Sequence, residues 1–140
     1  MNITLEADYA LRIVYVFSCN NIKTDAPTLS ERIGVSLRFT LKILRKLLLA
    51  GIVRSYKGKS GGYMLAKEPK DISMYDVITA IEGEIPVNRC TCEDYECGHP
   101  DVKQGLPCPV RHVFIDMAED LRQRLGAIDF QQVVDGEAKY

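Results

Sequence analysis

Thr28-Leu-Ser-Glu31-Arg-Ile-Gly34-Val-Ser36-Leu-Arg-Phe-Thr-Leu-Lys-Ile-Leu-Arg-Lys-Leu-Leu-Leu49 carries the start and end signals of two consecutive helices. Thr28 and Glu31 fit a capping box, so we expect a short helix that begins at Thr28 and ends at Gly34. Ser36 is expected to cap a second, longer helix that runs to about Leu49. A short helix, a tight turn containing glycine and a longer helix together predict a helix-turn-helix.

The second helix is expected to bury a leucine stripe and to expose a basic face. The expected stripe consists of Leu37, Leu41, Leu44, Leu47 and Leu48. In a helix-turn-helix the second helix lies in the major groove of DNA, with its first residues near the bases. We expect three of its side chains to face the groove and two others to lie near phosphates. The first set is Arg38, Thr40 and Lys42, the second is Ser36 and Arg45, and Thr28 of the preceding helix is a further candidate DNA contact.

Two short β-prone runs follow this helix, Ile52–Tyr56 and Tyr63–Ala66. The glycine-rich segment between them, Lys57-Gly-Lys-Ser-Gly-Gly62, predicts the tip of a β-hairpin, which is the wing of a winged helix. Lys57 and Lys59 at this tip are expected to reach a neighbouring phosphate or groove. The tip lacks the spacing of a nucleotide-binding loop, and no helix follows it directly.

Charge is strongly partitioned along the chain, although the net charge is only −1. Residues 36–70 contain nine Lys and Arg residues against one acid, whereas residues 71–108 contain eight acids against two bases. A binding partner experiences the local field rather than the net charge, so the first segment suits nucleic acid. A solvated basic face is the alternative interpretation of the same charges.

Three further helices are expected outside the helix-turn-helix. One covers residues 5–19 and is capped by Thr4, and another covers residues 73–82. The third runs from Val110 to about Leu125, with apolar residues that repeat at steps of four, three and four at Val110, Phe114, Met117 and Leu121. One helix cannot bury such a seam alone, so it is expected to pack on the same chain or on a second copy. For a helix-turn-helix protein, a symmetric dimer on two half-sites favours the second copy. The residues expected to dock back after it are Ile128, Phe130, Val133 and Val134.

Four of the five cysteines lie within 19 residues, at Cys90, Cys92, Cys97 and Cys108. Glycine and proline interrupt this segment throughout, which predicts a loop rich in soft ligands. No run approaches the roughly 20 apolar residues of a membrane span, and no signal peptide is recognisable, so a cytoplasmic location is expected. Clustered thiols in that compartment more often bind metal or sense redox state than form stable disulfides. A zinc site and a thiol switch are alternative interpretations, and Cys19 is expected to be buried.

The chain resembles the winged helix-turn-helix regulator family of IscR, NsrR and CymR (the Rrf-two family) over nearly its whole length. The resemblance is carried by Asp8-Tyr-Ala-Leu-Arg12, Ser36-Leu-Arg-Phe39, Gly51-Ile-Val-Arg-Ser55 and, most specifically, the wing Gly58-Lys-Ser-Gly-Gly-Tyr63. Sensors of this family place cluster-binding cysteines between the DNA-reading part and the dimerisation helix. Other members bind no cluster and act through a protein partner.

The resemblance implies a ligand set for an iron–sulfur cluster of the 2Fe–2S or 4Fe–4S type. The family's three-cysteine pattern is best matched by Cys90, Cys97 and Cys108, and Cys92 is an extra cysteine. The candidates for a fourth ligand are Asp8 of the partner subunit, His112 and Cys92.

The predicted fold is mainly α with a small β-hairpin. It comprises a winged helix-turn-helix domain at residues 1–83, a cysteine-rich sensor loop at 84–108, and a dimerisation helix with a C-terminal tail at 109–140. The predicted function is that of a homodimeric repressor of a palindromic double-stranded DNA operator, sensing iron, redox state or nitric oxide through an iron–sulfur cluster. The alternative is a cluster-free regulator of the same fold that acts through a protein partner or a thiol switch. A redox enzyme or electron carrier is disfavoured, because neither needs a basic helix with a wing and no catalytic motif is present.

Overall fold

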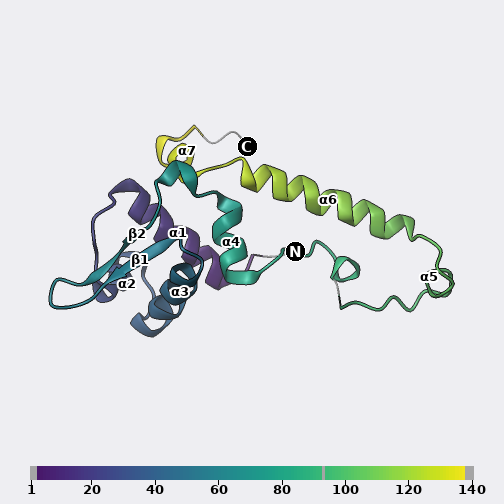
Figure 1. The fold of residues 1–140 in the computed structure, drawn as a ribbon, viewed down its shortest axis with the longest axis horizontal. Helices are drawn as coiled ribbons and strands as arrows, with labels where there is room; N and C mark the ends of the chain where they lie inside the picture. The colour runs from purple at the N-terminus through teal and green to yellow at the C-terminus, as the bar shows by residue number, and fades with distance from the viewer. Residues whose placement is uncertain (1–2, 93, 138–140) are drawn as a thin grey trace.

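The computed structural model describes residues 3–92 and 94–137 (Figure 1). A helical body contains α1 (Leu5–Cys19), α2 (Ala26–Ile33), α3 (Leu37–Leu49), the hairpin β1 (Val53–Tyr56) and β2 (Gly62–Leu65), the 3-10 turn η1 (Pro69–Asp71) and α4 (Met74–Glu82). An arm extends from this body through η2 (Arg89–Thr91), α5 (Pro100–Lys103) and α6 (Pro109–Gly126), and α7 (Phe130–Asp135) returns to the body. The prediction of a mainly helical winged helix-turn-helix is confirmed.

Helix α1 supplies much of the core of the body. Thr4 caps it as predicted, because the Thr4 hydroxyl oxygen accepts a hydrogen bond from the Ala7 backbone N–H at 3.2 Å. The buried face of the helix consists of Ala7, Ala10, Ile13, Val14 and Phe17. Helix α1 packs against α3, α4 and α7, so it connects the helix-turn-helix with the elements at both ends of the arm.

Helix α2 begins earlier than predicted. Asp25 caps it and accepts a hydrogen bond from the Thr28 backbone N–H at 2.8 Å, which lowers the pKa of the Asp25 carboxyl. The prediction that Thr28 caps this helix is therefore wrong, because Pro27 is tolerated in the first turn, where its missing N–H is not needed. Gly34 ends α2 in the left-handed conformation at φ 72°, and Ser36 caps α3, both as predicted.

Helix α3 buries a different stripe from the one predicted. Its core-facing residues are Thr40, Ile43, Leu44 and Leu47, whereas Leu37, Leu41 and Leu48 remain exposed. Thr40 is tolerated in the core because its hydroxyl donates to the Ser36 backbone carbonyl at 3.1 Å. The buried face of α3 is therefore rotated towards Ile43 relative to the predicted one. The spacing of the leucines alone did not indicate this rotation.

Strands β1 and β2 pair antiparallel, with Val53 opposite Leu65, and form the predicted wing. The hairpin is attached to the loop before α2, because the backbones of Thr24 and Tyr63 exchange hydrogen bonds of 3.0 and 2.8 Å. Only glycine fits at position 62, since a Cβ atom on Gly62 would lie 2.8 Å from the Thr24 carbonyl oxygen. The hairpin is thus fixed to the body at the start of β2, and the tip projects beyond this point.

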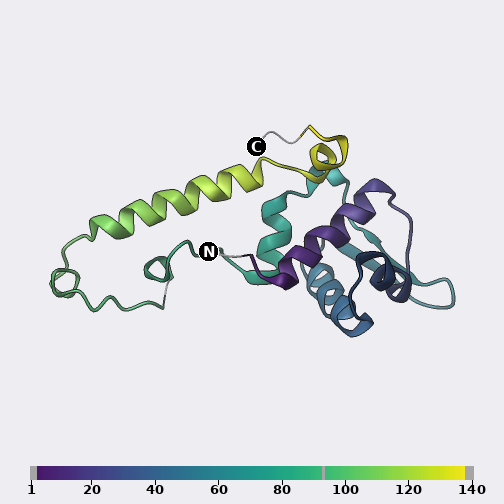
Figure 2. The same ribbon diagram turned by 180° about the vertical axis from the view of Figure 1, so that it is seen from behind.

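The C-terminal end of the arm, where α6 leads into α7, is fixed to the body by backbone hydrogen bonds and by one aromatic side chain. The Met74 N–H donates to the Ile128 carbonyl at 2.9 Å, and the Phe130 N–H donates to the Ile72 carbonyl at 3.0 Å. The Phe130 side chain is 1% exposed and belongs to the core of the body. Figure 2 shows α7 seated above α1 and α4, which confirms that the residues after α6 dock back.

Helix α6 has no buried residue along its 18 residues. Val110 is 60% exposed, Val113 57% and Met117 50%, so apolar side chains face solvent in the single chain. Phe114 and Leu121, the other members of the predicted seam, are half-buried. Within residues 3–92 and 94–137, no helix is long and apolar enough to cross a membrane.

Candidate DNA-binding surface and cysteine arm

The outer side of α3 and the tip of the wing carry exposed cations. Arg38 and Arg45 lie on α3, away from the face that packs on the core. Lys57 and Lys59 are exposed at the tip of the hairpin. Both elements belong to the body rather than to the arm (Figure 1). They give the body a basic surface made of one helix and one hairpin.

The hydroxyl residues among the candidate DNA contacts differ in their surroundings. Thr28 is exposed in the first turn of α2. Ser36 is also exposed, although its hydroxyl oxygen already accepts the Phe39 N–H at 3.3 Å as the cap of α3. Thr40 is 0% exposed, so the prediction that it faces the groove is wrong. Its side chain lies on the face of α3 that packs against the core instead.

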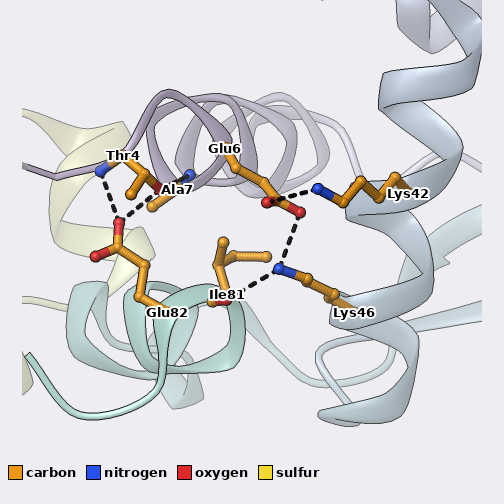
Figure 3. A network of polar contacts seen from close by, with 7 residues as sticks. All are labelled: Thr4, Glu6, Ala7, Lys42, Lys46, Ile81 and Glu82. Atoms are coloured by element: carbon orange, nitrogen blue, oxygen red, sulfur yellow. Dashed lines mark hydrogen bonds and ion pairs between the residues drawn. The ribbon is translucent and has the colours of Figure 1, made fainter.

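Lys42 pairs with α1 instead of extending freely from α3 (Figure 3). The Lys42 Nζ lies 3.1 Å from Glu6 Oε2, and the Lys46 Nζ lies 3.0 Å from Glu6 Oε1. Lys46 also donates to the backbone carbonyl of Ile81, near the end of α4, at 3.1 Å. A contact between Lys42 and DNA would therefore compete with an intramolecular ion pair.

Glu6 is the centre of a polar junction between α1, α3 and α4. Burial raises the pKa of Glu6, but the hydrogen bonds and charges of Lys46 and Lys42 outweigh burial and leave the pKa below its ordinary value. At the start of α1, Glu82 of α4 accepts hydrogen bonds from the Thr4 backbone N–H and hydroxyl, both at 2.7 Å. The orientation of α3 is thus tied to the two helices that pack beside it.

A Glu6→Gln substitution tests this junction, because it removes the negative charge and preserves the size of the side chain. We expect the free energy of unfolding to fall by about 1 kcal/mol at pH 7, since solvent screens the exposed Lys42. The folded-state pKa of Glu6 is lowered, so its stabilising contribution is complete above the ordinary carboxyl pKa and is lost as the pH falls through the folded value. Urea unfolding should therefore show a smaller difference between wild type and variant in acid. An equal difference at both pH values would contradict the assignment.

A second group of cations lies where the strands of the wing meet its tip, and it was not identified from the sequence. The Lys23 Nζ and the Arg54 guanidinium carbon lie 5.3 and 5.6 Å from the centre of the Tyr56 ring. These distances fit cation–π contacts, which bring two positive charges beside the hairpin. The position of the aromatic residue Tyr56 within a basic stretch was the feature of the sequence that could have indicated its contact with Arg54. Lys23 gave no signal, because it is far from them in the sequence.

The four clustered cysteines lie along the arm and are half-exposed. Cys90 lies in η2, Cys92 directly follows η2, Cys97 lies in an irregular segment, and Cys108 directly precedes α6. The Asn88 side-chain oxygen caps η2 and accepts a hydrogen bond from the Cys90 N–H at 3.3 Å. Local capping therefore orders the beginning of the segment.

Cys19 lies apart from this segment, at the last residue of α1. The prediction that Cys19 is buried is wrong, because the buried face of α1 ends at Phe17. A hydrogen bond with Cys19 raises the pKa of the Tyr15 phenol one turn earlier. Both side chains are exposed.

The donor chemistry of the arm fits an iron–sulfur cluster, because thiolates are the usual ligands of such clusters. Among the described residues of one chain, however, no three His, Cys, Asp or Glu side chains are grouped so that they could hold a metal ion. His112 is exposed in the first turn of α6. Asp8 lies on α1, where its carboxylate pairs with the Arg12 guanidinium at 3.0 Å. The structure therefore places the candidate ligands on separate elements and does not bring them together.

Cys92 lines a cavity of about 670 Å³ between α4 and α6. Tyr75 and Ile115 contribute to its walls, together with the ion pair of Glu119 and Arg122. Hydrogen bonds from Arg122 and Gln123 lower the pKa of Glu119 to about 2. The cavity places the extra cysteine next to the long helix of the arm.

A helix-turn-helix on a buried core, an exposed basic helix and a lysine-tipped hairpin define the class of the protein as winged helix-turn-helix transcriptional regulators. A family model described as an iron-dependent transcriptional regulator, Rrf2, matches residues 3–136. The chain belongs to the Rrf2 family, which confirms the resemblance noted in its motifs.

Individual relatives agree with this classification. The chain is 27% identical over 136 residues to the HTH-type transcriptional regulator IscR of Vibrio atlanticus, covering 96% of this chain and 75% of that protein. It is 32% identical over 121 residues to an Rrf2-like HTH-type transcriptional regulator of Rhodobacter capsulatus, covering 82% and 80%. The structure of CymR, the global cysteine regulator of B. subtilis, shares the fold with a TM-score of 0.74 at 22% identity, covering 97% of this chain and 98% of that one. The prediction of a regulator rather than an enzyme is confirmed.

Proposed function

We propose that this regulator is a dimeric repressor that senses iron, redox state or nitric oxide through an iron–sulfur cluster held by its arm. The observation that carries the proposal is the attachment of both a basic recognition helix and a cysteine-bearing arm to one core. Glu6 ties α3 to α1 through Lys42 and Lys46 at 3.1 and 3.0 Å, and Phe130 fixes the far end of α6 to the same core. A change in the conformation of the arm would therefore be transmitted through this core to α3, the helix proposed to contact DNA.

Operator recognition is assigned to α3 and the wing. The exposed guanidinium groups of Arg38 and Arg45 suit base edges and phosphates, because arginine presents its donors in a planar fork. Lys57 and Lys59 supply positive charge to flanking phosphates from the wing tip. The exposed starts of α2 and α3 add backbone and hydroxyl donors, with the side chains of Thr28 and Ser36 nearest to them.

A second copy of the chain is assigned to the exposed face of α6. Val110, Val113 and Met117 are at least half-exposed along this helix and are left uncovered by the described part of the chain. Pairing two such helices would remove these side chains from water. A two-fold dimer would also present two recognition helices to the two halves of a palindromic operator.

The proposed cluster ligands are Cys90, Cys97 and Cys108. A bound cluster would supply a redox-active centre whose stability depends on its ligands. The fourth ligand is Asp8 of the partner subunit, His112 or Cys92. Of these, Asp8 pairs with Arg12 in the single chain, so its use as a ligand requires that the ion pair open. The segment that carries the proposed ligands is ordered at both ends. Asn88 caps η2 at its start, and α6 begins directly after Cys108 at its end.

A cluster-free regulator of the same fold is the second candidate function. Two observations favour it: the thiols of the arm are half-exposed, and the described residues assemble no group of three metal donors. In this case the thiols would report oxidation directly, through a sulfenic acid or a disulfide, or the arm would bind a regulatory protein.

A Lys57→Ala/Lys59→Ala double variant tests the DNA-binding surface. Each lysine that neutralises a phosphate contributes about 0.9 to the slope of log affinity against log salt concentration. Loss of both is expected to reduce that slope by about 2 and to weaken binding to operator and unrelated duplex alike. Fluorescence anisotropy between about 50 and 200 mM salt measures both effects.

The matched control is Lys67→Ala/Lys70→Ala, which removes two exposed lysines that lie beyond the hairpin. This variant is expected to keep the wild-type slope. An unchanged slope in the Lys57→Ala/Lys59→Ala variant would show that the wing tip does not contact DNA.

A further inference from the structure

Besides Leu49 at its C-terminal end, three leucines are exposed on α3, the helix assigned to the major groove. Leu37 is 42% exposed, Leu41 is 41% and Leu48 is 38%. The core contacts of this helix are made by other side chains, so burial in the body does not account for these three. An exposed apolar group in the middle of a basic surface matches a partner that displays both negative charge and an apolar group.

Leu41 lies directly between the two exposed arginines of α3. Arg38 is three residues before it and Arg45 four residues after it, and residues at these spacings are neighbours on a helix surface. The opposite flank of α3 is already occupied by α1, where the Phe39 ring meets the Tyr9 ring edge-on at 6.0 Å. The free side of the helix thus presents an apolar side chain framed by two guanidinium groups.

The major groove of DNA matches this arrangement. Phosphates border the groove, and the C5-methyl group of thymine is the apolar group displayed on its floor. A second copy of the chain matches less well, because a symmetric contact through this side of α3 would bring Arg38 and Arg45 of one copy close to those of the other.

We propose that Leu41, with Leu37 one turn earlier, reads thymine methyl groups in each half-site of the operator. The inference rests on the proposed function, in which α3 enters the major groove, and adds a specific base preference to it. The arginines would fix the helix in the groove, and the leucines would favour thymine over cytosine at the positions that they contact.

The test begins with duplexes that the wild-type protein selects from a random pool. Each thymine of the selected site is then replaced in turn by deoxyuridine, which removes the methyl group and leaves the hydrogen-bonding edge unchanged. We expect one or two positions in each half-site at which this replacement weakens binding about fourfold, the factor for burying one methyl group. The Leu41→Ala variant should bind the thymine site more weakly and should lose most of its sensitivity to deoxyuridine at those positions.

Leu49→Ala is the matched control, because Leu49 is exposed at the far end of the same helix. This variant should keep the wild-type deoxyuridine profile, and thermal melting checks that both variants are folded. Normal binding of wild type with no sensitivity to deoxyuridine at any thymine would overturn the inference and leave the proposed function intact. A Leu41→Ala variant that changes the oligomeric state without DNA would overturn it too, by assigning the leucines to a protein contact. Failure of wild type to select any duplex would contradict the proposed function itself.

Discussion

A Cys97→Ala variant purified without oxygen is expected to contain almost no cluster iron. Its operator affinity should also stay the same after reconstitution with iron and sulfide, whereas that of wild type should change. Cys97 is half-exposed in an irregular segment of the arm, so its substitution should leave the packing of the body unchanged. Iron–sulfur clusters are held mainly by soft thiolate ligands, and water or a carboxylate replaces a lost thiolate poorly. Removal of one of the three proposed cysteine ligands should therefore prevent stable binding of the cluster. Iron and sulfide content, visible absorbance and operator binding provide the measurements.

Cys19→Ala is the matched control, because it removes an exposed thiol from the body rather than from the arm. Its iron content should equal that of wild type. Cys92→Ala separates two of the proposed ligand sets: its iron content is unchanged if Cys92 is the extra cysteine and falls if Cys92 is the fourth ligand. A Cys97→Ala protein that keeps both its iron and a cluster-dependent operator affinity would contradict the ligand assignment.

Phe130→Ala is expected to lower the free energy of unfolding by about 3–5 kcal/mol, the range for truncation of a fully buried phenylalanine. Phe130 is 1% exposed, and it belongs to the core that contains Phe17 of α1. Its backbone N–H is fixed to the Ile72 carbonyl at 3.0 Å, which limits how far the surroundings can collapse into the cavity. The ring also anchors the end of α6, so the variant should exchange the amide hydrogens of α7 faster.

Urea unfolding at a fixed protein concentration measures this loss, because dimerisation would add a concentration-dependent contribution. Gln131→Ala is the matched control, since Gln131 is the next residue of α7 and is exposed. It should change the free energy of unfolding by no more than about 0.5 kcal/mol. A loss below about 1 kcal/mol for Phe130→Ala would show that α7 is not part of the stable core.

Features of the fold that depend on neighbouring residues were predictable from the sequence. Ser36 caps α3 and Gly34 ends α2, because capping and left-handed backbone are properties of single positions. The glycine-rich tip and its β-prone flanks likewise indicated the wing. The start of α2 was misplaced because two residues, Asp25 and Thr28, both have the chemistry of a cap.

Features that depend on tertiary contacts were not predictable in the same way. The burial of Thr40 depends on how α3 sits against the body, and the leucine pattern favoured a different face. Glu6 lies 36 residues before Lys42, so no local pattern indicates their ion pair. This pair shows why a basic residue on a recognition helix is not necessarily free to contact DNA.

The cysteine segment was recognisable as a ligand-rich loop, but its ligand geometry was not. Glycine and proline leave such a segment without a regular conformation of its own, and metal sites commonly take shape only when the metal binds. The proposed site of Cys90, Cys97 and Cys108 would therefore need the metal and a second subunit to complete it. Asp8, which lies on α1 of the body, is the candidate ligand that would join two subunits in this way.

The most direct test compares the operator affinity of one oxygen-free preparation of wild-type protein before and after removal of its iron. We expect a coloured, iron-containing dimer whose operator affinity changes by about 5-fold to 150-fold when the cluster is removed, the usual range for coupling between two sites. A colourless, iron-free protein that binds its operator with full affinity, or a coloured protein with the same affinity in both forms, would contradict it.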